Sequence, residues 1–303
     1  MTEAASHRER HGSDLHDELT VSVIVPTFHD WERLGVCLQA LGAQTYPAHL
    51  IEVIVVNNDP SDVPPESLSL GKNVRLFSEE KAGSYAARNT GVSAASGNVL
   101  AFTDSDCIPD EEWLATGVDR LRNGAERVAG RVAMFAPSEQ PTLADEYEIL
   151  VAFDQERYAS LGTSATANMI TWSHHFTRVG AFDGSLLSGG DMEWGMRAQH
   201  LGVSIAYAPE CVVRHPTRAS LRALFAKARR VSSGHATTRA LDRQRYSLLR
   251  SFLPPKTVLR VLRAPRPSLA RRLQIAALAY ALKLWSTLHA GLIGANITAP
   301  RRG

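Results

Sequence analysis

Two aspartates that stand one residue apart are the first candidates for chemistry in this 303-residue chain. Asp104 and Asp106 directly follow residues 98–103, an apolar run short enough to predict a strand rather than a helix. Side chains two residues apart on a strand share a face, so both carboxylates point the same way if the backbone stays extended. Like charges this close repel unless a cation lies between them, and oxygen ligands favour Mg²⁺ or Mn²⁺ over Zn²⁺. The alternative interpretation is a surface turn, because Asp and Ser are common turn residues.

Alternating strands and helices must position these carboxylates. Apolar, β-branched runs predict strands over 20–26, 51–56, 73–77, 98–103, 127–135, 164–172, 203–207 and 211–216, and apolar stripes predict helices over 31–43, 83–95, 111–121 and 142–160. The alternation predicts an α/β fold with a mostly parallel central sheet that helices cover on both faces. No Gly-x-Gly-x-x-Gly follows the first strand and no Gly-Lys-Ser/Thr phosphate loop is present, which disfavours a dinucleotide fold and a P-loop ATPase.

Polar residues follow three of these strands at the point where each strand ends. They are Thr27 and Asp30, Asn57 and Asp59, and Asp104 and Asp106. In open parallel sheets, ligands bind beyond the carboxyl ends of the strands. Three such ends on one edge predict a crevice of nucleotide size.

The cysteines and the N-terminal residues give two further expectations about the chain. Cys37, Cys107 and Cys211 lack the spacing of a disulfide framework or a zinc site, which is typical of a reducing compartment. Residues 1–17 are polar and charged, and predict a disordered tail rather than a signal peptide.

The charge is distributed unevenly along the chain. From Arg214 onward the sequence holds 19 of the 33 Lys/Arg but one of the 31 Asp/Glu, so this part carries about +18 and residues 1–213 about −16. The imbalance indicates an anionic partner, either membrane lipid or nucleic acid, or a tail that packs on the acidic domain. Stacking aromatics are sparse and no nucleic-acid module is evident, so we expect no nucleic acid.

Two segments of this basic region have apolar faces. Residues 217–230 predict a basic amphipathic helix, with Leu221, Leu224 and Phe225 on one stripe. Residues 273–293 are long enough to span a bilayer, but Lys283 near the middle would cost about 2.5–3.5 kcal/mol there. An interfacial or core helix is therefore preferred over a spanning one.

The stretches 81–91 and 97–107 closely resemble family 2 glycosyltransferases, the inverting enzymes with the GT-A fold. The opening Val25-Pro26-Thr27, the segments 180–183 and 190–193, and the segment around His215 follow in the family's order. The resemblance covers roughly residues 20–216. It implies a GT-A domain over 18–216, followed by a basic helical region over 217–303 that could associate with a membrane surface.

The resemblance also implies roles for the donor residues. A nucleotide-sugar donor, expected to be a UDP-sugar, would bind with Pro26, Thr27 and Asp30 at the base and ribose, and Arg88 would help to hold the nucleotide. Asp104 would contact ribose or metal, and Asp106 would coordinate the Mn²⁺ or Mg²⁺ that bridges the diphosphate. His215 is either a further metal ligand or a hydrogen-bonded histidine before a proline.

On the acceptor side, the resemblance makes Asp191 the general base that deprotonates an acceptor hydroxyl. From local sequence alone, Asp191 could instead be the N-cap of a helix. The acceptor would be a glycan or a lipid-linked glycan in cell-envelope or exopolysaccharide synthesis. The enzyme would be cytoplasmic, or peripheral at the inner face of the cell membrane.

The sequence departs from the family pattern at two positions. Asn57 stands where the family usually has Asp against the base; its carbonyl can still accept a hydrogen bond, and Asp59 is the alternative carboxylate for this role. The family's Glu-Asp pair is here Gly190-Asp191, and Glu193 is expected to be a positioning or structural residue. No Gln/Arg-rich processive signature is evident after residue 197, which favours transfer of one sugar per encounter.

Two other functions compete with glycosyl transfer. A nucleotidyltransferase that makes the nucleotide sugar also uses paired carboxylates and a metal, but it needs a Gly-rich, basic loop after the first strand, and residues 26–30 lack one. A non-catalytic glycan- or lipid-binding scaffold on a transferase fold is the second alternative. Retention of Asp104, Asp106 and Asp191 together disfavours it.

Overall fold

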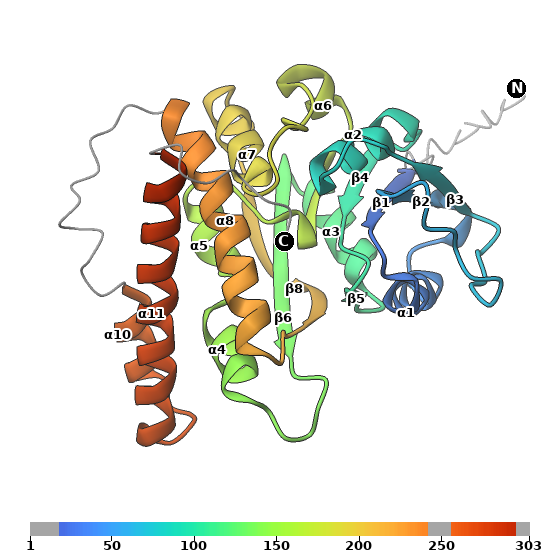
Figure 1. Cartoon of the computed structure of the whole chain (residues 1–303). Coiled ribbons are helices and arrows are strands. Elements are labelled where there is room, and N and C mark those ends of the chain that lie inside the picture. The colour runs from blue at the N-terminus through green and yellow to red at the C-terminus, as the bar shows by residue number, and fades with distance from the viewer. Residues whose placement is uncertain (1–17, 242–255, 295–303) are drawn as a thin grey trace, which may run out of the picture.

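The fold is built on one twisted sheet with a parallel half (Figure 1). The computed structural model describes residues 18–241 and 256–294. Its strands are β1 (Val21–Thr27), β2 (Ile51–Asn57), β3 (Val74–Ser78), β4 (Val99–Phe102), β5 (Ile108–Pro109), β6 (Arg127–Phe135), β7 (Met169–Trp172) and β8 (Ala206–Pro216). They are ordered β3-β2-β1-β4-β7-β6-β8-β5. The β3-β2-β1-β4 half and the β6-β8 pair are parallel, whereas β7 and β5 run antiparallel to their neighbours, so the predicted mostly parallel α/β sheet is confirmed.

Strand β1 lies at the centre of the parallel half because both of its faces are apolar. All seven of its residues are buried. It pairs in register with β2 and β4, so that Val21 faces both Ile51 and Val99. The carboxyl ends of β1, β2 and β4 therefore open on one edge of the sheet, as the three polar strand ends predicted.

Helices cover both faces of the sheet. Their bounds are α1 (Trp31–Gly42), α2 (Ser84–Ala94), α3 (Trp113–Arg122), α6 (His174–Val179) and α7 (Gly190–His200). Helices α1 and α3 bury Leu34 and Trp113 in the cluster that contains Val23, on one face of β1. Residue Ile24, on the other face of β1, packs in a second cluster with side chains of α2, α6 and α7, such as Trp194. The alternation of β1 side chains thus divides the core into two layers.

The predicted helix 142–160 is wrong as a single element. The structure has α4 (Leu143–Val151) and α5 (Gln155–Ser160), separated at Phe153, which takes a left-handed φ of +49°. The Asp154 side chain accepts a hydrogen bond from the backbone N–H of Arg157, so the second helix starts with its own cap. The break aims the Phe153 ring at His215, with the ring centroids 4.9 Å apart.

Two strand predictions also need correction. Residues 164–168 are not part of the strand, because the buried Gln155 amide bonds to the backbone of Ala165 and Asn168, and a 3₁₀ turn (Thr166–Asn168) precedes β7. The predicted strands 203–207 and 211–216 are one strand, β8. A bulge opposite Gly130 and Arg131 takes up the residues between them.

The C-terminal helices pack against the domain at one end of the sheet (Figure 1). They are α8 (Leu221–Leu241), α10 (Lys256–Arg263) and α11 (Leu269–Gly294), and they meet α4. Leu224 of α8 is buried with Leu278 and Leu282 of α11. Leu224 and Phe225 of the apolar stripe predicted at 217–230 therefore contact protein, which agrees with the alternative of a tail that packs on the acidic domain, whereas Leu221 of the same stripe is 45% exposed.

A buried ion cluster ties α8 to α4. Glu148, 1% exposed, bonds to the Lys227 ammonium at 2.7 Å and to the Arg218 guanidinium at 3.1 Å. Burial alone would raise the pKa of Glu148, but the two cations outweigh it and hold the pKa below its usual value. The acidic domain and the start of the basic region are thus joined by charge as well as by packing.

Residues 273–293 are helical, inside α11, as predicted. No helix within 18–241 or 256–294 combines the length and the apolar character needed to cross a membrane. The predicted disordered tail, 1–17, lies outside the described residues, as do residues 242–255 and 295–303 of the basic region.

Candidate functional site

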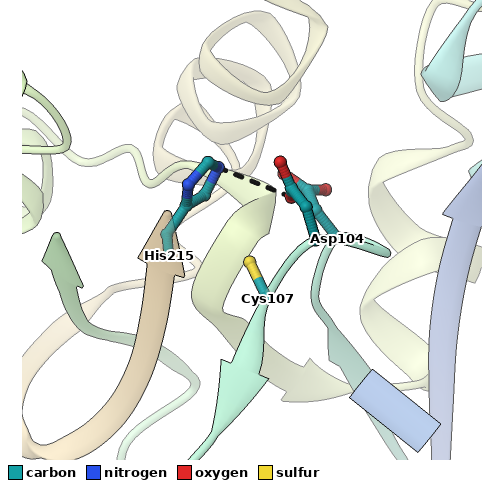
Figure 2. A group of neighbouring side chains, drawn as sticks. Asp104, Cys107 and His215 are labelled. Atoms are coloured by element: carbon teal, nitrogen blue, oxygen red, sulfur yellow. Dashed lines mark ion pairs between the residues drawn. The ribbon is translucent and has the colours of Figure 1, made fainter. Parts of the chain in front are cut away.

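The centre of the candidate site is a group of four potential ligands beside the ends of β4 and β8 (Figure 2). Asp104 and Asp106 lie in the loop between β4 and β5. Strand β5 pairs with β8 so that Ile108 faces Arg214, which brings His215 next to the two carboxylates. Ligand atoms of Asp104, Asp106, Cys107 and His215 all lie within 4.8 Å of one another. The surface-turn interpretation of the two aspartates does not account for this grouping.

The donor atoms of this group fit a hard divalent cation. His215 Nδ1 lies 2.7 Å from the Pro216 carbonyl oxygen, which can only accept, so Nδ1 donates and leaves the Nε2 lone pair free. Nε2 lies 3.6 Å from Asp106 Oδ1. Burial, followed by the charges of Asp104 and Asp106, raises the pKa of the Cys107 thiol well above its usual range, so the sulfur stays protonated and is a poor ligand. Two carboxylates and one imidazole remain, a set that suits Mn²⁺ or Mg²⁺.

Arginines from two helices face the same carboxylates. The Arg88 side chain of α2, 4% exposed, forms an ion pair with Asp104, and its Nε is buried with no hydrogen-bond partner within the described chain. Arg33 of α1 lies 2.8 Å from Asp30 and 3.6 Å from Asp106. Arg88 was predicted as a nucleotide contact, whereas Arg33 was missed because only the fold places α1 beside residue 106.

A third arginine reaches the site from the basic C-terminal region. Arg230 of α8 is close enough to Asp104 and Tyr85 for electrostatic interaction, and its buried Nε has no hydrogen-bond partner among residues 18–241 and 256–294. Burial lowers the pKa of this guanidinium, which nevertheless stays charged. One helical turn earlier, Lys227 lies 5.2 Å from the centroid of the Phe153 ring, which contacts His215. The sequence predicted Lys227 and Arg230 only as part of the basic amphipathic helix over 217–230, and not as residues of the site.

The carboxyl end of β1 offers one free polar group. Pro26 and Thr27 are buried at this end, and no residue of the described chain is a hydrogen-bond partner of Thr27 Oγ1. Asp30 Oδ1 accepts a hydrogen bond from Arg33 Nε. Of the three predicted base and ribose contacts, Thr27 therefore has an unused hydroxyl, whereas Asp30 is already paired.

The end of β2 is largely occupied by its own loop. Asn57 Nδ2 donates to the backbone oxygens of Asp59 and Asp62, and Asn57 Oδ1 accepts from the Asp59 N–H. The Asp59 carboxylate accepts from Ser61 and lies 3.0 Å from His29 Nε2. Asn57 can therefore offer a nucleotide one remaining lone pair, on Oδ1.

Asp191 lies in the first turn of α7 and is held by three donors. The helix begins at Gly190 and its N-cap is Gly189, so the alternative of Asp191 as the N-cap is wrong. Asp191 Oδ1 accepts from the Tyr85 hydroxyl and from the Met192 N–H, both at 2.9 Å, and Oδ2 accepts from the Thr166 N–H at 3.3 Å. Sequence reasoning missed Tyr85, which lies 106 residues away along the chain.

Glu193 does not point into this cluster of donors. Its carboxylate forms a salt bridge with Arg197 one turn later on α7, with 2.6 Å between Oε1 and Nε. The geometry agrees with the structural role expected for Glu193.

Comparison with known proteins connects this geometry to a family. The model of the family "Glycosyl transferase family 2" matches residues 22–177. The chain is 36% identical over 239 residues to the glycosyltransferase AglE of Haloferax volcanii, covering 77% of each chain. The chain belongs to glycosyl transferase family 2. As a member of this family the chain is a glycosyltransferase enzyme, which disfavours the nucleotidyltransferase and the non-catalytic scaffold.

Solved structures with a similar fold support the GT-A architecture. A mannosyltransferase from Pyrobaculum calidifontis, solved with GDP-Man and Mn²⁺, aligns with a TM-score of 0.56 and 20% identity, covering 92% of this chain and 86% of that one. The S. aureus protein TarS, residues 1–349 with UDP, aligns with a TM-score of 0.51 and 18% identity, covering 86% and 70%. The predicted family 2, GT-A fold is confirmed.

Proposed function

We propose that this family 2 glycosyltransferase transfers a sugar, with inversion, from a nucleotide sugar to a hydroxyl of a glycan or lipid-linked acceptor. A UDP-sugar is the favoured donor, and cell-envelope or exopolysaccharide synthesis is the favoured setting. One observation carries the proposal: a carboxylate held by three donors, Asp191, is connected through Tyr85 and Arg88 to the Asp104, Asp106 and His215 cluster. The relatives with bound UDP and with bound GDP-Man and Mn²⁺ support a nucleotide-sugar site of this kind.

The donor half of the site uses groups that have unfilled bonding capacity. Asp104, Asp106 and His215 would hold a divalent cation. A divalent cation bound there supplies positive charge where the leaving nucleoside diphosphate becomes more negative. Arg88 and Arg230 each keep a buried Nε–H that can donate to a phosphate oxygen.

The nucleoside would lie beyond β1 and β2. The free hydroxyl of Thr27 and the remaining Oδ1 lone pair of Asn57 would bind the base or ribose, beside Pro26. Asp30 and Asp59 lie at the same edge, where they are paired with Arg33 and His29. Each would bind the base or ribose only after it exchanges its present partner for the nucleotide.

The acceptor half uses Asp191 as general base. Its carboxylate takes the proton of the acceptor hydroxyl as that oxygen forms a bond to the anomeric carbon. The bond from the anomeric carbon to the nucleoside diphosphate oxygen breaks in the same displacement, and its electron pair leaves with the nucleotide. Attack from the side opposite the leaving group inverts the anomeric configuration without a covalent enzyme intermediate.

The function is tested by the products of a donor screen. Sugar nucleotides that raise the melting temperature with Mn²⁺ are selected first, because a ligand that binds the folded state stabilises it. With a selected donor and a hydroxyl acceptor, we expect release of nucleoside diphosphate and a product of inverted configuration, read by NMR. Release of pyrophosphate would indicate a nucleotidyltransferase, and retained configuration or no turnover of any donor would contradict the proposal.

For a lipid-linked acceptor, the outward face of α11 is the part of the basic region suited to a membrane surface. It presents apolar side chains at helical spacing, each between 43% and 59% exposed: Leu269, Leu273, Trp285, Leu288 and Leu292. Residues 256–294 contain no Asp or Glu. An apolar stripe with basic flanks and an exposed Trp is typical of a helix at the interface of an anionic bilayer. This would place the enzyme in the cytoplasm, peripheral at the inner face of the membrane.

Replacing Leu273 and Leu288 with serine is expected to lower partition of the full-length protein into anionic vesicles by at least tenfold, since two buried leucines contribute about 1.5–3 kcal/mol each. Val63→Ser, at a 74% exposed site in the loop after β2, is the matched control and should not change partition. Equal partition of the double variant and the wild type would remove α11 as the contact. If the wild type is a dimer without vesicles and the double variant is a monomer, the exposed stripe serves self-association instead.

A further inference from the structure

Tyr85 is a buried tyrosine whose hydroxyl is used on the acceptor side of the site. It lies in the first turn of α2, is 6% exposed, and bonds to Asp191 Oδ1 at 2.9 Å. Burial, followed by the Asp191 charge, raises the pKa of Tyr85 far above its usual range. The hydroxyl therefore keeps its proton and is the donor in this bond.

The bond distinguishes the two oxygens of the Asp191 carboxylate. Oδ1 accepts two hydrogen bonds at 2.9 Å, from Tyr85 and from the Met192 N–H. Oδ2 accepts one long bond, 3.3 Å, from the Thr166 N–H. Because Oδ1 is engaged twice, Oδ2 is the oxygen with lone pairs available to an acceptor hydroxyl.

The Tyr85 ring also explains why the residue before Asp191 is glycine. A Cβ atom at Gly190 would lie 2.8 Å from the Tyr85 ring, closer than side-chain carbons approach one another. The ring thus occupies the space into which the side chain of a residue at 190 would extend. The acid that the family usually has before its base is replaced here by a close fit between Gly190 and Tyr85.

The same ring contacts the donor side of the site. The Arg88 guanidinium lies 5.5 Å from the Tyr85 ring centroid, and Arg88 is paired with Asp104. Tyr85 therefore touches both the residue that faces the acceptor and the residue that neutralises a carboxylate of the cation site.

We infer that Tyr85 is a positioning residue for Asp191, which it orients so that Oδ2 faces the acceptor hydroxyl. The inference rests on the proposed role of Asp191 as general base. The phenol ring packs against Gly190 and Arg88, and the hydroxyl fixes the carboxylate. Removal of the hydroxyl alone should therefore affect the chemical step and leave the donor site intact.

Tyr85→Phe is expected to lower kcat by about 10- to 100-fold, the size of one lost hydrogen bond to a charged group. The ring and its contact with Arg88 remain, so the Kd for nucleoside diphosphate with Mn²⁺ should be unchanged.

Tyr46→Phe is the matched control. Tyr46 is also buried, in the core cluster that contains Val23 rather than in the cluster that contains Tyr85, and its hydroxyl donates to the Leu19 carbonyl at 2.6 Å. Both variants should lose similar thermal stability, but the control should keep the wild-type kcat. Gly190→Ala should reproduce the kcat loss of Tyr85→Phe, since its Cβ displaces the ring.

Three results would overturn the inference: a Tyr85→Phe variant with wild-type kcat, a loss of donor affinity that matches the loss of kcat, or an equal kcat loss in Tyr46→Phe. A fully active Asp191→Asn variant would instead remove the proposed base itself. An inactive Asp191→Asn with an unaffected Tyr85→Phe would remove Tyr85 alone.

Discussion

Replacing Asp191 with asparagine is expected to lower kcat by a factor of about 10²–10⁴, the usual contribution of a positioned general base. The carboxamide has nearly the same shape, and its oxygen can still accept from the Tyr85 hydroxyl and the Met192 N–H. The fold of the first turn of α7 should therefore survive. What the amide cannot do is take the proton of the acceptor hydroxyl.

The Asp191→Asn variant is expected to lose catalytic rate without losing affinity for the nucleotide. Initial rates of transfer should fall, whereas titration of nucleoside diphosphate in the presence of Mn²⁺ should give a wild-type Kd, because Asp191 belongs to the acceptor half. Glu193→Gln is the control on the same helix turn: its charge is paired with Arg197, and its removal should leave transfer within about threefold of wild type. Undiminished turnover in Asp191→Asn would exclude Asp191 as the base.

Much of the fold follows from local patterns in the sequence. The runs at 20–26 and 51–56 are buried on both faces, which is why they were recognisable as central parallel strands. The break at Phe153 was missed because residues 142–160 keep a helical pattern across it. What divides this stretch is the non-local bonding of Gln155 to Ala165 and Asn168, together with the cap at Asp154.

The candidate site likewise combines residues that the sequence alone can identify with residues that only the fold identifies. Asp104, Asp106 and Arg88 stand in or beside recognisable strand ends and motifs, so the sequence could nominate them. Tyr85 and Arg230 could not be nominated, because their roles depend on partners that only the fold brings close. A basic residue in an apolar, basic helix looks the same in sequence whether it faces lipid, solvent or a buried carboxylate.

Replacing Asp106 with alanine is expected to abolish the dependence of nucleotide binding on the metal. In the wild type, Mn²⁺ should tighten UDP binding by at least tenfold in calorimetry, because Asp104, Asp106 and His215 converge on one point. Loss of one of three protein ligands should reduce the affinity for Mn²⁺ alone, titrated without nucleotide, by at least tenfold. Transfer should fall together with the metal affinity.

Asp110→Ala is the matched control for Asp106→Ala. Asp110 follows in the same loop region, but its carboxylate pairs with Arg214 at the surface, 3.1 Å away, so neither Mn²⁺ nor UDP affinity should change. The control separates loss of a ligand from loss of negative charge in the neighbourhood.

Metal-independent binding of UDP would contradict this prediction, and the arginines of the site make that outcome specific. Arg88 pairs with Asp104, Arg33 lies near Asp106, and the half-buried Arg230 is close enough to Asp104 for electrostatic interaction. If these arginines alone neutralised the diphosphate, UDP would bind tightly without metal, and Asp106→Ala would bind it more tightly still, since a competing carboxylate has been removed. The direction of the change in metal-free UDP affinity on Asp106→Ala therefore tells whether the aspartates serve to hold a cation or only to position the arginines.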